Sequence, residues 1–127
     1  MASLFELEQP SFGRSSTGLA LVTAANADVT LSAAQSVGAV VAHTPTSNKT
    51  VTTAVGADII TELGPQAKVG QTFEVVVVNL GGSTHTSTFT AGATGVTVTG
   101  VAAVQPGSSG TFIGRVATAS TVIYYRK

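Results

Sequence analysis

The chain has 127 residues, of which 43% are hydrophobic and only 9% are charged, and its formal net charge is zero. This composition excludes an intrinsically disordered chain, because disorder requires low hydrophobicity and high net charge. The lack of cysteine excludes disulfides, thiolate metal sites and a cysteine nucleophile. A surface with so little charge protects a free monomer poorly against association. We therefore expect copies of the chain or a larger assembly to cover it; a small secreted β domain with an uncharged polar surface is the alternative.

Residues 1–18 differ from the rest and are expected to form an N-terminal arm. Ser3 and Glu6 have the spacing of a capping box, which predicts a helical turn over residues 3–9 that Pro10 ends. So short a helix is not stable alone, so the apolar side chains of the arm need a surface on the same domain or on a neighbouring subunit. A disordered leader is the alternative. The candidate contact residues of the arm are Leu4, Phe5, Leu7 and Phe12.

From residue 19 onward the sequence indicates short strands and almost no helix. Residues 75–78 are an uninterrupted run of valines between turn signals, the pattern of a strand that is buried on both faces. Residues 58–63 form an apolar segment that Gly64 and Pro65 end. Strands are expected over residues 19–23, 28–31, 39–44, 49–55, 72–80, 84–90, 96–101, 111–117 and 120–126.

About eight to ten short strands at this spacing predict an all-β fold. We expect an antiparallel β-sandwich or jelly roll that forms a single domain over residues 19–127, preceded by the extended arm of residues 1–18. The expected core residues are Val51, Ile59, Phe73, Val75, Val77, Phe112 and Ile113.

Few residues in the chain carry reactive chemistry. His43 ends an expected strand and His85 lies in an expected hairpin, and neither has a carboxylate nearby in the sequence. We therefore interpret both as surface or loop histidines rather than as members of a Ser-His-Asp triad, and two histidines alone make a poor zinc site. The carboxylates are scattered, and no phosphate-binding loop or calcium loop is present. The sequence predicts no enzyme activity, no cofactor and no metal site.

The same reading excludes two classes of partner. The lysines and arginines form no basic patch in the sequence, so nucleic-acid binding is not expected. No apolar stretch approaches the roughly 18 residues that cross a bilayer. The first residues are acidic and lack the pattern of a secretory signal, so we expect synthesis in the cytoplasm and no membrane partner.

The segment from Gly70 to Asn79 and the segments that follow it resemble small β modules of tailed-bacteriophage virions. The matching pattern is a Gly-x-x-Phe strand that ends in Asn, followed by Thr-His-Thr alternation and by segments such as 91–98, 104–112 and 121–125. The resemblance covers about residues 63–127 and is greatest to capsid decoration (cement) proteins. It implies a homotrimeric structural protein that binds the major capsid protein on the outer surface of the virion. There it would clamp neighbouring capsid subunits, after synthesis in the host cytoplasm.

Two other functions stay open at this point. A module at the tip of a head or tail fibre would bind a host receptor or glycan through surface aromatics, for which Phe89, Tyr124 and Tyr125 are available. A small hydrolase would need His43 or His85 beside a carboxylate and a serine.

Overall fold

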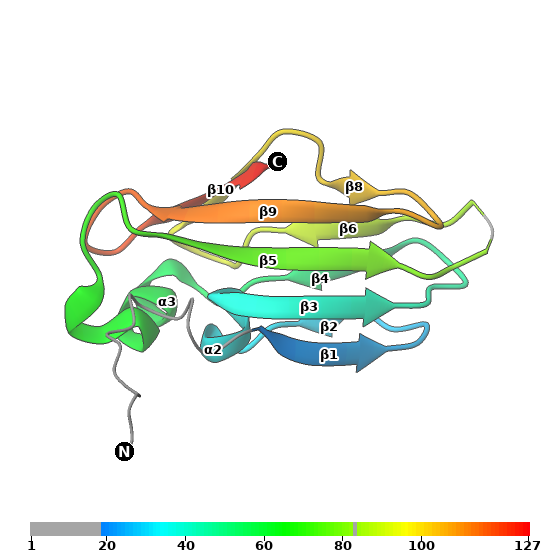
Figure 1. The fold of residues 1–127 in the computed structure, drawn as a ribbon, viewed down its shortest axis with the longest axis horizontal. Helices are drawn as coiled ribbons and strands as arrows, with labels where there is room; N and C mark the ends of the chain where they lie inside the picture. Colours follow the sequence, from blue (N-terminus) through cyan, green and yellow to red (C-terminus); the bar gives the residue numbers. More distant parts are fainter. Residues whose placement is uncertain (1–18, 83) are drawn as a thin grey trace, which may run out of the picture.

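The computed structural model describes residues 19–82 and 84–127, and these residues are mainly strands, which confirms the prediction of a largely β fold (Figure 1). In chain order the elements are β1 (Ala20–Ala24), β2 (Val29–Thr30), α2 (Ala33–Ser36), β3 (Gly38–His43), β4 (Lys49–Thr52), α3 (Gly56–Leu63), the 3-10 helix η1 (Gly64–Gln66), β5 (Thr72–Asn79), β6 (Ser87–Thr90), β7 (Val96–Thr99), β8 (Ala103–Val104), β9 (Ser109–Val116) and β10 (Val122–Arg126).

The strands form two sheets. One has six strands in the order β1-β3-β5-β9-β10-β7, and the other has four in the order β2-β4-β6-β8. In Figure 1 strands β1, β3, β5 and β9 lie in front of β2, β4 and β6. The first six strands alternate between the sheets, so that the chain winds through three successive two-strand rungs, β1–β2, β3–β4 and β5–β6.

This winding corrects the expected antiparallel pairing. Because the chain returns to the same sheet only at every second strand, neighbours such as β1 and β3, or β4 and β6, run in the same direction. In the part of the chain that the structure describes, five strand pairs are parallel and three are antiparallel. Alternation of apolar residues predicts that a strand exists, but it does not carry the direction of the neighbouring strand.

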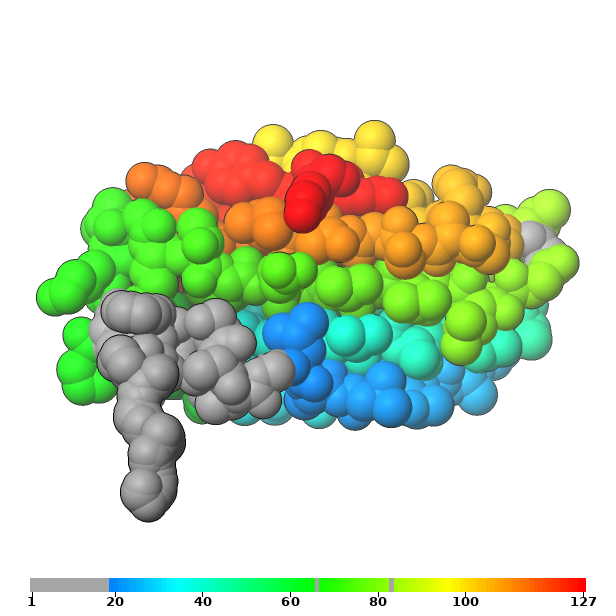
Figure 2. Space-filling view, in the orientation of Figure 1, coloured from blue at the N-terminus to red at the C-terminus, as the bar shows by residue number. Residues whose placement is uncertain are grey.

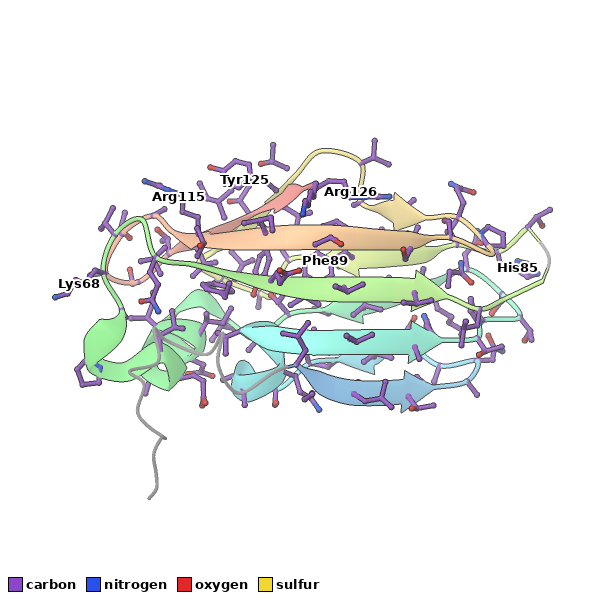
Figure 3. All side chains as sticks on the ribbon, in the orientation of Figure 1. Lys68, His85, Phe89, Arg115, Tyr125 and Arg126 are labelled. Atoms are coloured by element: carbon purple, nitrogen blue, oxygen red, sulfur yellow. The ribbon has the colours of Figure 1, made fainter. Side chains whose placement is uncertain are left out.

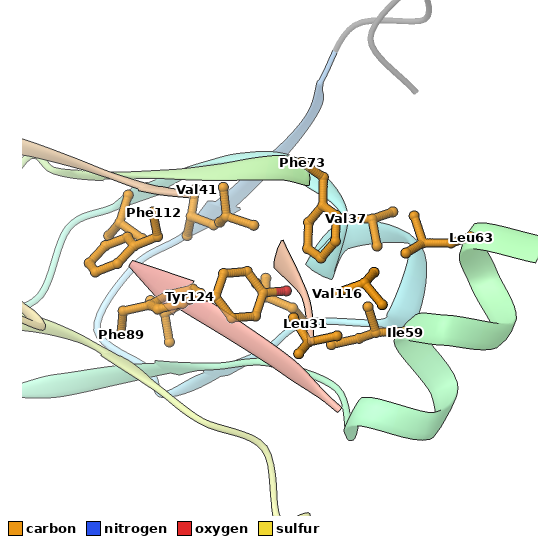
Figure 4. Close-up of a cluster of buried hydrophobic side chains, with 14 of the residues drawn as sticks. Leu31, Val37, Val41, Ile59, Leu63, Phe73, Phe89, Phe112, Val116 and Tyr124 are labelled. Atoms are coloured by element: carbon orange, nitrogen blue, oxygen red, sulfur yellow. The ribbon is translucent and has the colours of Figure 1, made fainter. Parts of the chain in front are cut away.

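The core lies between the sheets and takes side chains from both (Figure 4). Phe112 of β9 stacks on Phe89 of β6 with ring centroids 4.3 Å apart, and Tyr124 of β10 meets Phe89 edge to face at 5.1 Å. Six of the expected core residues are buried. The seventh, Ile113, is half-buried and faces away from the core, because it follows Phe112 on a strand and successive side chains point to opposite faces.

Two short helices lie at the end of the sheets. The expected apolar segment 58–63 is the helix α3, whose buried residues Gly56, Ile59 and Leu63 recur at helical spacing and lie on one side. The helix α2 begins at a capping box in which Ser32 accepts a hydrogen bond from the Gln35 backbone at 3.2 Å, while the Gln35 side chain accepts one from Ser32. Both helices follow strands of the four-stranded sheet and return the chain to the six-stranded sheet.

Candidate interaction surface

The structure places His43 in the interior rather than on the surface, which corrects the interpretation of this residue. Its side chain is fully buried at the end of β3. The imidazole Nε2 lies 2.8 Å from the Ala27 carbonyl oxygen, so this nitrogen carries a hydrogen and donates it. The Nδ1 atom then accepts from the hydroxyl of Ser87, also 2.8 Å away and fully buried. His43 thus joins the six-stranded sheet to β6 of the other sheet.

This histidine–serine pair lacks the third member of a catalytic triad. The neighbouring carboxylate, Asp28, instead accepts hydrogen bonds from the Thr50 backbone at 3.0 Å and from its hydroxyl at 3.3 Å. The backbone bond is the main reason that the pKa of Asp28 is lowered. His43 contacts a backbone carbonyl where a triad needs a carboxylate, and neither His43 nor Ser87 is open to a substrate. The arrangement is that of a structural cross-link between the sheets.

Replacement of His43 by alanine is expected to lower the free energy of unfolding by about 2–3 kcal/mol. The substitution removes a buried side chain and leaves the Ser87 hydroxyl and the Ala27 carbonyl without their partner. His85→Ala is the matched control, because His85 is only half-buried and is expected to change stability by about 0.5 kcal/mol. Urea unfolding at a fixed protein concentration measures both values. Equal effects of the two substitutions would contradict the assigned cross-link.

Within residues 19–82 and 84–127 no group of three or more His, Asp or Glu side chains is placed to hold a metal ion. Of the helices in this part of the chain, none is long and apolar enough to cross a membrane. The arm residues Leu4, Phe5, Leu7 and Phe12 lie outside the described residues.

The aromatic residues that a glycan-binding tip would use are mostly internal. Phe89 and Tyr124 are buried in the core, and the Tyr124 hydroxyl donates a hydrogen bond to the Ser36 carbonyl. Only Tyr125, which is 39% exposed, reaches the surface among the three residues considered for this role. A single partly exposed ring provides no aromatic platform for a sugar, so this candidate site is not assembled.

A candidate interaction surface is the outer face of the six-stranded sheet, which carries several apolar side chains. Burial alternates along its strands: in β5, for example, Val75 and Val77 point into the core, whereas Val76 and Val78 point outward and stay half-buried. Figure 2 shows this face, with β1, β3, β5 and β9 crossing it. Threonines fill many of the remaining outward positions of these strands. The apolar side chains of the outer face are Leu21, Val40, Val76, Val78, Ile113, Ile123 and Tyr125.

Strand register makes these side chains neighbours. Leu21, Val40 and Val76 stand opposite one another in a row across β1, β3 and β5. In a second row Ile113 stands opposite Tyr125 of β10. Cross-strand pairs of this kind pack at about 5 Å, so side chains within a row are in contact. Between the two rows Val76 stands opposite Thr111 and Ile113 opposite Glu74, so polar side chains interrupt the apolar surface there. Leu21 is 71% exposed and lies on β1, which among the described strands pairs with β3 alone.

Within the described strands two charged side chains stand on the outer face, one of each sign. Glu74 of β5 lies opposite Ile113, and Arg115 of β9 lies opposite Thr72, so the two charges are diagonal neighbours across one strand pair. Neither makes an ion pair with any described residue. Arg115 is exposed and projects from the front of the sheet beside Tyr125 (Figure 3).

The sequence contained a signal for this surface, in the valine run of residues 75–78. Such a run is typical of a strand that is buried on both faces. Among the described residues the core buries the inner valines of β5 completely, whereas the outer valines are only partly buried. The sequence pattern is that of a face covered by another surface, whereas the outer face of β5 is only partly buried. We therefore interpret the outer face as an interaction surface.

Similarity to characterised proteins adds no assignment for this surface. No protein-family model, no curated protein sequence and no solved structure shows a significant match to this chain.

Proposed function

We propose that the chain is a structural protein that acts by binding a larger assembly rather than by catalysis. The observation that carries this proposal is the outer face of the six-stranded sheet, where β1, β3, β5, β9 and β10 each contribute outward apolar side chains. Monomeric proteins rarely expose apolar patches larger than a few hundred Å², and such patches mark interaction sites. The low charge content of the chain supports the same conclusion.

The assembly that we propose is the capsid of a tailed bacteriophage, on the strength of the sequence resemblance over residues 63–127. In this role the protein decorates the outside of the capsid as a homotrimer and clamps neighbouring copies of the major capsid protein. Each contact can be modest, because tethering three copies raises the effective concentration of the second and third contacts. The described residues, 19–82 and 84–127, are mainly β and contain only short helices, which suits a compact clamp on a shell.

We also infer that the two sheets form a β-sandwich with mixed strand directions. Both sheets contribute side chains to one core cluster, and the stacked pair of Phe89 and Phe112 joins them. Such a layered body presents one broad flat face on each side. Because the other sheet has only four strands, the six-stranded sheet would then present the larger contact surface.

The test measures the mass of the purified chain in solution and its cosedimentation with expanded tailed-phage capsids that lack a decoration protein. We expect a trimer that binds the capsids with saturable stoichiometry. A stable monomer that ignores the capsids would overturn the proposal. A variant that lacks residues 2–17 tests the arm: unchanged affinity for the capsid would remove Leu4, Phe5, Leu7 and Phe12 from the mechanism.

A further inference from the structure

We draw no further inference here: the strongest candidate, the two threonine rows on the outer face of the four-stranded sheet (Thr30, Thr52 and Thr90 in one, Thr50 and Thr88 in the other), carries none, because nothing in the described residues shows what covers that face.

Discussion

Replacement of Phe112 by alanine is expected to lower the free energy of unfolding by about 3–5 kcal/mol, the range for deletion of a buried aromatic ring. The side chain is fully buried and stacks on Phe89 at 4.3 Å with 18° between the ring planes. The guanidinium carbon of Arg126 also lies over the ring, 5.4 Å from its centroid. The substitution therefore removes core volume together with the contact that joins the two sheets. Urea unfolding at a fixed protein concentration measures the loss.

The next residue along the strand supplies the control. Ile113 is also a large apolar residue of β9, but it points outward. Ile113→Ala is expected to lower the unfolding free energy of the monomer by only about 1 kcal/mol, since little core volume is lost. If the two substitutions destabilised the monomer equally, the assignment of the inner and outer faces of the six-stranded sheet would be wrong.

Asn79→Ala is expected to cost about 3–5 kcal/mol, although it removes no apolar group. The Asn79 amide is fully buried at the end of β5 and donates to the carbonyls of His85 and Val104, both at 2.9 Å. Its oxygen accepts from the Gly81 backbone at 2.9 Å. Alanine would leave three backbone groups unpaired, and each buried unpaired group costs about 1–3 kcal/mol. Thermal and urea unfolding both report this loss.

The control for this prediction is Asn48→Ala. Asn48 accepts a single hydrogen bond, from the Thr86 backbone at 3.0 Å, and its side chain is exposed, so water can replace it. The expected cost is below about 1 kcal/mol. A cost at Asn79 no larger than that at Asn48 would show that the three buried bonds do not hold the loop after β5.

Local sequence patterns predicted most strands well, because alternation and turn residues act over a few positions. The strand expected over residues 72–80 is β5, Thr72–Asn79, and the strand expected over residues 111–117 lies within one or two residues of β9. The helix α3 was missed although Gly56, Ile59 and Leu63 have helical spacing, because its eight residues can also be read as an apolar strand.

The parts that could not be predicted depend on residues far apart in the sequence. The direction of β3 beside β1 follows from the passage of the chain through the other sheet, which no local pattern records. The burial of His43 requires Ser87, which is 44 residues away. For the outer face, the valine run of residues 75–78 was the only signal in the sequence. The other residues of this face lie on β1, β3, β9 and β10, and strand pairing alone makes them neighbours of the run.

The winding of the chain through alternate sheets has a consequence for how the protein folds. Ala20 pairs with Ala39, and Ala39 pairs with Val75, so these contacts close loops of 19 and 36 residues (39 − 20 and 75 − 39). Non-local pairings of this kind fold slowly, because the entropy of closing the loop is lost before the contact forms. During synthesis β1 and β3 emerge before the central strand β5, and their apolar edges stay open until it arrives. The interval before β5 is complete is therefore the stage at which the nascent chain is most prone to aggregation.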